Sequence, residues 1–311
     1  MKRWNKILLV FSFLFIITSS FSQNEKLIIG RTTGKLLIRK NLEIRTFGFT
    51  NSLSAQVTFP GSDIQVQQGD SVNIDFWNIS QGNPVSLFCK EIEFVQRNKQ
   101  NEIMKTKEAI HHMEHGFYSF QAKKAGTYLY YSPENYPFNL QAGMFGVIII
   151  RSKQIDSAPQ SVAEVLWCSN EIDTKWHTNA IMGTEYDVDN KPLMLPDYTP
   201  NYFLINGKTT NNIKGLQSRD HKKEAVLLRL VNSGLYVHEI QFPMPIKLEL
   251  ISGNETSVQA LSQGKVRLKS GECLELMAFL ENTADKEFIV YHFINPLSNK
   301  ISYEAILPVF Y

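Results

Sequence analysis

Cysteine is scarce in this sequence, which has only Cys89, Cys168 and Cys273 among its 311 residues. An odd number leaves at least one thiol outside any disulfide, and no pair of cysteines, or of cysteine and histidine, has the spacing of a zinc site. A disulfide framework is therefore not required, and we expect the three thiols to pack as small buried apolar side chains.

An excess of charge of either sign is also missing. The 32 basic and 30 acidic residues give a formal net charge of +2, which creates no field for nucleic acid or for an acidic membrane surface. We expect neither as a partner. The length is sufficient for one large domain or two ordinary ones.

Familiar catalytic and nucleotide-binding motifs do not occur. The sequence has no GxSxG turn, no GxGxxG or P-loop, and no cysteine with a recognisable histidine and asparagine arrangement. Its carboxylates are scattered and define no acid and base pair. Nucleophilic and nucleotide-binding sites are therefore not indicated.

Long apolar runs are limited to one, at the start of the chain. The chain begins with a positively charged segment that contains Lys2, Arg3 and Lys6. The apolar run, residues 7–17, comes next, and the small residues Ser20 and Ser22 come after it. This is the order of a secretory signal. The run is too short to span a bilayer, so we expect cleavage of residues 1–22; a retained anchor is the alternative. No later run is long enough to be a membrane span, so we expect a soluble secreted chain, periplasmic or extracellular.

Alternating apolar and polar residues dominate the remainder, as in "DIQVQQGDSVNIDFWNIS" and "ECLELMAFLEN". A period of two over strand-sized segments predicts all-β sandwiches. The polar residues 153–162 are typical of a linker, which would separate a domain at 23–152 from one at 163–311. The best helical candidate is residues 101–115, "NEIMKTKEAIHHMEH".

Six motifs occur in the order used by one family. The first half has "FPGSDIQVQQGDSVNIDFWNIS", "AGTYLYYS" and "AGMFGVIIIRS"; the second has "YFLINGK", "LLRLVNSGLYVHEIQF" and "LKSGECLELMAF". This arrangement resembles the multicopper oxidases and copper nitrite reductases. The resemblance implies two tandem cupredoxin-like Greek-key sandwiches.

The resemblance also locates the positions where the family binds copper. In the closing loop "YYSPENYPFNLQAGM", Ser132 stands at the cysteine position, Asn139 at the histidine and Met144 at the methionine. Phe88 and Lys90 stand at the two histidine positions of the preceding strand. The copper-cluster HSH motif becomes Tyr131, Ser132 and Pro133.

A blue copper centre needs a thiolate and two imidazoles, with a distant thioether. Only the thioether of Met144 remains here, and in the second half Phe293 stands at the thiolate position beside His292. His238 also lies at a position where some family members have histidine. We therefore expect no copper cofactor, and we expect Met144 to act as an adaptable core side chain.

Aromatic residues surround the closing loop, and two interpretations of them remain open. Tyr130, Tyr136, Phe138 and Phe145 would either fill the space left by copper or form a docking surface for a protein.

A dense group of metal donors occurs in "HHMEH", with His111, His112 and His115 flanking Met113 and Glu114. On a helix, residues 111 and 115 would share one face and would chelate a divalent metal weakly. A solvated loop is the other interpretation.

The sequence thus favours a secreted, copper-free binding or structural protein of the cell envelope with a protein partner. The alternative is a copper oxidoreductase with rebuilt ligands, drawn from the HHMEH group, Met144 and Cys89. A homo-oligomer fits either hypothesis.

Overall fold

The computed structural model describes residues 23–82, 84–152, 162–183, 194–209, 212–213, 215–217, 225–253, 261, 263–280 and 286–310. The predicted signal and residues 153–161 of the predicted linker lie outside them, so the proposed boundaries stay predictions. The described chain consists of strands and two short helices, α1 (Phe138–Ala142) and α2 (Asn179–Met182). The all-β prediction is confirmed.

The first half contains two sheets. Sheet I has the order β2 (Leu42–Thr50), β1 (Gln23–Arg39), β4 (Ser71–Asn78), β7 (His115–Gln121) and β6 (Val95–Arg97). Sheet II has the order β3 (Ile64–Gln67), β9 (Phe145–Arg151), β8 (Gly126–Tyr131) and β5 (Phe88–Cys89).

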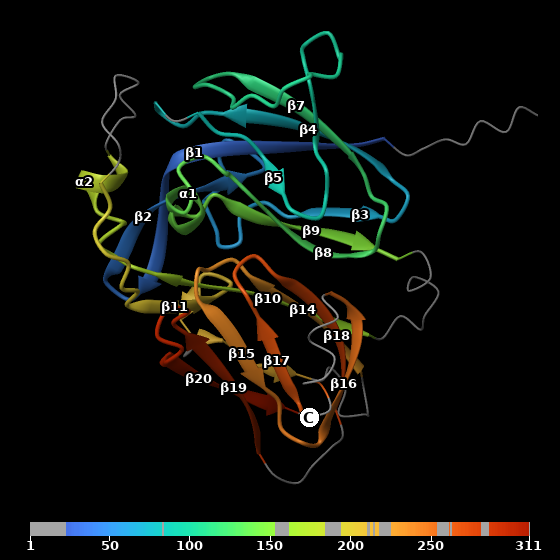
Figure 1. The fold of residues 1–311 in the computed structure, drawn as a ribbon, viewed down its shortest axis with the longest axis vertical. Coiled ribbons are helices and arrows are strands. Elements are labelled where there is room, and N and C mark those ends of the chain that lie inside the picture. The colour runs from blue at the N-terminus through green and yellow to red at the C-terminus, as the bar shows by residue number, and fades with distance from the viewer. Residues whose placement is uncertain are drawn as a thin grey trace, which may run out of the picture.

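The second half repeats this plan with two larger sheets (Figure 1). Sheet III has the order β12 (Lys208–Thr209), β11 (Tyr202–Ile205), β10 (Ala163–Ile172), β14 (Ala225–Asn232), β18 (Cys273–Leu280) and β16 (Ile246–Ser252). Sheet IV has the order β13 (Leu216–Gln217), β20 (Ile301–Phe310), β19 (Glu287–Ile294), β15 (Val237–Gln241) and β17 (Lys265–Leu268). All strands of sheets I and II precede residues 153–161 in the sequence, and all strands of sheets III and IV follow them.

Alternation along the strands builds the core of each half. In β4, Val72, Ile74 and Phe76 are buried while the residues between them are half-buried. Successive side chains of a strand point to opposite faces of the sheet, so this pattern places one face of sheet I against sheet II and leaves the other towards solvent. The aromatic rings of the first half, such as Phe76 and Tyr118, pack at 6.3 Å in this interior.

A third apolar cluster joins the two halves. Leu129 of β8 and Val147 of β9 pack in one cluster with Cys168 of β10 and Val231 of β14. Because sheet II faces its own domain on one side and sheet III on the other, β9 is buried along nearly its whole length. This explains why "FGVIII" is continuously apolar rather than alternating.

A buried charged cluster lies at the edge of this contact. Arg229 of β14 and Glu275 of β18 form an ion pair, and both are only 4% exposed. Thr127 of β8 donates to Glu275 Oε1 at 2.6 Å and accepts from Arg229 Nη1 at 3.1 Å. The two hydrogen bonds of Thr127 to this ion pair therefore form only when the halves are in contact.

The helix predicted at residues 101–115 is wrong. The segment is irregular, and Ile110 pairs with Val85 in an isolated bridge while Met113 has a φ of 62°. His115 already belongs to β7. Burial of Ile110 beneath this bridge outweighs the helix propensity of its neighbours, which is worth only tenths of a kcal/mol per residue.

Two of the three thiols are buried, as expected: Cys89 and Cys168. Cys273 is half-buried, and none of the three is in a disulfide. Among the described residues, neither helix has the length or the apolar character to cross a membrane.

Gly143 ends α1 with a φ of 116°, and a Cβ there would lie 2.5 Å from the carbonyl oxygen of Phe47. We expect Gly143→Ala to lower the free energy of unfolding by about 3 kcal/mol, because backbone strain and overpacking add. The matched control is Gly271→Ala, with a φ of 79° and nothing within 4 Å, for which about 1 kcal/mol is expected. Equal losses in denaturant titrations would contradict this.

Candidate functional site

The closing loop brings Ser132, Asn139 and Met144 together, and all three are at most 1% exposed. The Ser132 amide donates to the Met144 carbonyl at 3.0 Å, and the Met144 amide donates to the Asn139 carbonyl at 2.9 Å. Asn139 Nδ2 donates to Ser132 Oγ at 3.0 Å. The three residues that the resemblance assigned to one site therefore lie together, joined by hydrogen bonds.

Glu134 completes this cluster, together with Ser86 from the segment before β5. Ser132 Oγ donates to Glu134 Oε2 at 2.6 Å, and the Ser86 amide donates to the same oxygen at 3.0 Å. The Ser86 hydroxyl contacts Glu134 Oε1. We name Ser86, Ser132, Glu134 and Asn139 the loop cluster. Sequence reasoning missed Ser86 and Glu134, because Ser86 precedes β5 in irregular chain and the two residues are 48 positions apart.

Phe88 does not point into the loop cluster. Its ring is 37% exposed and packs edge-on against Tyr131 at 5.4 Å, whereas Cys89 is buried on the opposite face. Lys90 and Pro133 are exposed. The strand alternation expected for Phe88 and Cys89 is thus present.

These residues do not fit copper. The Ser132 hydroxyl is directed to a carboxylate, and the Asn139 amide nitrogen is directed to that hydroxyl. Neither is a soft donor, and a benzene ring supplies no lone pair. Among the residues that the structure describes, no three His, Cys, Asp or Glu side chains are placed to hold a metal ion.

The aromatic residues divide between the two interpretations. Tyr130, Phe138 and Phe145 are at most 4% exposed, so the docking role is wrong for these three and core packing is correct. Tyr130, for example, stacks on Phe49 at 5.5 Å and donates to the Ser62 carbonyl at 2.5 Å. Tyr136 is 55% exposed.

The HHMEH residues form an exposed turn that enters β7. His115 Nδ1 lies 2.6 Å from Asp75 Oδ1, and its ring stacks on Trp77 at 5.2 Å. His112 Nδ1 lies 2.9 Å from the carbonyl of Ser80. The imidazoles of residues 112 and 115 thus already have partners on different sides of the turn, and the shared helical face does not exist.

The second half contains a buried polar cluster that the sequence did not indicate. Glu171 accepts hydrogen bonds from the amides of Leu235 and Tyr236 at 2.5 and 3.0 Å, and lies 3.3 Å from His238 Nε2. His238 Nδ1 lies 2.8 Å from Ser169 Oγ, which is 2.6 Å from the Tyr291 hydroxyl. The Glu171 carboxylate, the His238 imidazole and the Ser169 hydroxyl are therefore linked in a row by hydrogen bonds.

This order is that of serine hydrolases, but its surroundings exclude that role. Ser169, Glu171 and His238 are all 0% exposed, so a substrate carbonyl has no access to Ser169 Oγ. Burial lowers the pKa of His238 and raises that of Tyr291. Both groups are held neutral, which suits a structural network.

The cluster links the two halves through Tyr198. The Tyr198 hydroxyl, which has one proton to donate, lies 2.5 Å from Gln141 Oε1 of α1 and 3.0 Å from the Glu171 carbonyl oxygen. Phe293 is fully buried with its ring 4.5 Å from that of His238, whereas His292 faces the other side and bonds Glu304 at 2.9 Å. Phe293, which the resemblance assigned to a thiolate position, is thus a packed core side chain.

Comparisons with known proteins agree with this architecture. Residues 47–155 match the family model described as multicopper oxidase. A blue copper oxidase from Nitrosomonas europaea superimposes with a TM-score of 0.66 at 17% identity, over 93% of this chain and 86% of that one. The copper nitrite reductase from the same organism gives a TM-score of 0.63 at 17% identity, over 92% and 93%. No curated protein matches the chain.

The fold defines a two-domain cupredoxin-like protein. Within that class, the chain is multicopper oxidase-like: its first half matches that family in sequence, and the described chain has the fold of those oxidases and of the copper nitrite reductases.

Ser132→Ala tests the loop cluster. Loss of the hydroxyl leaves a buried Asn139 donor without a partner and removes one donor to Glu134, so the free energy of unfolding should fall by about 1–3 kcal/mol. The control is Ser54→Ala at an exposed serine, which should change it by less than about 0.5 kcal/mol. Indistinguishable denaturant midpoints for the two variants would show that the cluster contributes nothing.

The buried imidazole predicts a pH dependence of stability. Because burial lowers the pKa of His238 below its ordinary 6.5, the unfolded chain takes up a proton more readily than the folded one. The contribution of the neutral His238 to the free energy of unfolding is therefore fully present above pH 6.5 and decreases as the pH drops below that value. Burial lowers the pKa of His177 as well, which acts in the same direction.

His238→Gln should reduce the slope of unfolding free energy against pH below 6.5, and His111→Gln at an exposed histidine should leave it unchanged. Urea titrations between pH 5 and 8 measure both. A slope for His238→Gln equal to that of the unmodified chain would contradict the assignment.

Proposed function

We propose that this protein is a copper-free, non-catalytic binding or structural component of the cell envelope that acts through a protein partner. The observation that supports the proposal best is the loop cluster. An amide nitrogen donates to a hydroxyl, and that hydroxyl donates to a carboxylate, where the related oxidases would require a thiolate and imidazoles. The scaffold motifs remain, but the donor set for electron transfer does not.

The chemistry of the loop cluster opposes the copper alternative. Inserting a cation between Ser132 and Asn139 would break the hydrogen bonds at 2.6 and 3.0 Å that hold the loop. Buried polar groups lose about 1–3 kcal/mol each when their partners are removed. Met144 would then be the sole soft donor, and a single thioether does not retain a transition metal.

A small aromatic patch beside the closing loop is the candidate docking surface. It consists of Phe88, Tyr131 and Tyr136, which are in mutual ring contact through Tyr131 at 5.4 and 6.1 Å. Phe88 and Tyr136 are well exposed, at 37% and 55%. Tyrosine and phenylalanine supply much contact area with few rotatable bonds, as protein interfaces favour.

The cell-envelope location rests on the first residues of the sequence, with their positive segment, short apolar run and small residues. The partner is either another envelope protein or a second copy of this chain. Both would bury the same aromatic patch.

Copper loading tests the absence of a cofactor. The mature chain, carrying no histidine tag, is incubated with Cu(II) and separately with Cu(I), desalted and measured by elemental analysis. We expect far less than one copper per chain, no thiolate-to-copper absorption band, no oxidation of phenols and no reduction of nitrite. A His111→Ala, His115→Ala variant identifies any weak uptake by the exposed histidines. One retained copper per chain with turnover would refute the proposal.

Photocrosslinking tests the docking surface. A photoreactive amino acid is placed at Tyr136 or, as a matched control, at Leu297, which is 96% exposed and lies in the other half. We expect a discrete crosslinked species in intact cells from position 136 and none from position 297. The mass of that species distinguishes a second copy from another protein. The absence of any position-specific product would contradict docking through this patch.

A further inference from the structure

A polar trough lies beside β4, β6 and β7 of sheet I, and its wider end also reaches Tyr128 of β8 and Ile150 of β9 in sheet II. It consists of two adjoining hollows of about 510 and 320 Å³. Both hollows are lined by Asn73 and Arg97, so these residues form their junction. Each volume lies in the range of about 300–1,000 Å³ that is usual for small-molecule sites.

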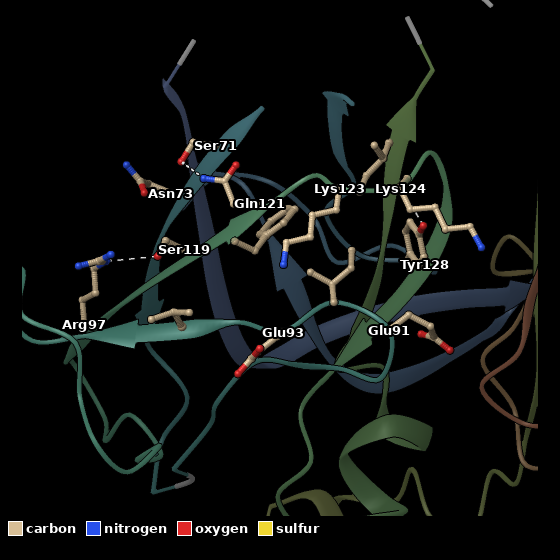
Figure 2. A pocket seen from close by; sticks show the side chains of 14 residues that line it. Ser71, Asn73, Glu91, Glu93, Arg97, Ser119, Gln121, Lys123, Lys124 and Tyr128 are labelled. Atoms are coloured by element: carbon tan, nitrogen blue, oxygen red, sulfur yellow. Dashed lines mark hydrogen bonds between the residues drawn. The ribbon is translucent and has the colours of Figure 1, made fainter. Parts of the chain in front are cut away.

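Strand pairing places the lining residues in rows across the sheet. Ser71 of β4 is opposite Gln121 of β7. Two residues further along β4, on the same face of the sheet, Asn73 is opposite Ser119 of β7. Neighbouring strands lie about 5 Å apart, so four hydroxyl and amide groups form a compact block without charge. Gln121 Nε2 donates to Ser71 Oγ at 3.0 Å, and Figure 2 shows this pair at the rim of the larger hollow.

The junction carries hydrogen-bonding capacity that the protein does not use. Arg97 is oriented by Nε, which donates to Ser119 Oγ at 3.3 Å, and by Nη1, which donates to the Asn101 carbonyl at 3.0 Å. Within the described part of the chain, Arg97 Nη2 and the Asn73 side-chain amide have no protein partner. A half-buried guanidinium held in one orientation is pre-organised to donate to a ligand.

Apolar surface lies between these polar groups. Ile92, Val95 and Phe120 contribute to the larger hollow, and Phe117 lines the smaller one. The Phe117 ring is roughly parallel to that of His115 at 6.4 Å, and His115 is itself held by Asp75. A fixed ring and an apolar floor suit a ligand whose faces are made of C–H groups and whose edges carry hydroxyls.

The charges around the trough nearly cancel. Arg97, Lys123 and Lys124 line the larger hollow with Glu91 and Glu93. In Figure 2 the Lys123 ammonium and the Glu93 carboxylate face the hollow from opposite sides. The smaller hollow adds Lys26 and Lys99 against Glu25 and Asp75. Such a mixture gives no net attraction for a polyanion.

From this geometry we propose that the trough binds a neutral oligosaccharide. Sugar hydroxyls both donate and accept hydrogen bonds, and so do the hydroxyl and amide groups of the block. Arg97 and Asn73, at the junction of the two hollows, would bind hydroxyls where two sugar units meet. The site shares no residue with the loop cluster. It therefore does not depend on the copper-free function proposed above.

Calorimetric titration of the full mature protein tests the inference. The probes are cellohexaose, xylohexaose, maltohexaose, mannohexaose and chitohexaose, with hexagalacturonic acid as the charged probe. We expect at least one neutral hexasaccharide to bind in the micromolar to low millimolar range. Asn73→Ala and Arg97→Ala should each weaken that binding about tenfold, since each loses hydrogen bonds to the ligand.

The matched control is Arg267→Ala, an exposed arginine on β17 of the second half, which should leave affinity unchanged. Unfolding curves verify that the variants fold. If Arg97→Ala does not fold, Asn73→Ala still tests the inference. No binding of any neutral probe, binding of hexagalacturonic acid alone, or binding that neither trough variant weakens would each overturn the proposal.

Discussion

Burial of β9 on both of its faces is the constraint on which the rest of the molecule depends. One face completes the interior of the first half, and the other packs against sheet III through Val147 and Ile149. The same strand begins at Phe145, directly after the closing loop. The position of the loop is therefore fixed by a strand that cannot shift without disturbing two apolar clusters at once.

This constraint fixes the path of the closing loop. Gly143 and Met144 must still turn the chain from α1 into β9, and the polar groups that this turn buries must still be satisfied. Ser132, Asn139 and Glu134 meet most of that requirement with hydrogen bonds to one another and to Ser86, while Asn139 Oδ1 is buried without a partner in the described chain. These hydrogen bonds tie the end of β8 to α1 and so hold the path of the loop.

The sequence was informative where local periodicity decides the structure. Alternation identified the strands, whereas the expected loss of strong copper ligands at Phe88, Ser132 and Asn139 rests on residue types alone and stays a prediction. It failed where distant segments meet. The HHMEH segment has helical spacing, yet pairing of Ile110 with Val85 decides its conformation. Neither the contact of Glu134 with Ser86 nor that of Glu171 with His238 is visible from spacing, because 48 and 67 residues separate the partners.

The docking aromatics illustrate the same limit. Tyr130, Tyr136 and Phe138 are close in sequence and similar in type, but only Tyr136 is exposed. Which ring enters the core depends on where β8 ends and α1 begins, and that is set by the fold around them rather than by composition.

The ion pair of Arg229 and Glu275, with Thr127 of the other half as their common neighbour, has a consequence for the chain as a whole. Separating the halves would strip that hydroxyl from two buried charges and expose the apolar cluster beside them, a cost of several kcal/mol. Neither half retains its native surroundings once the other melts. Heating should therefore produce one cooperative calorimetric transition, although the architecture has the appearance of two independent folding units.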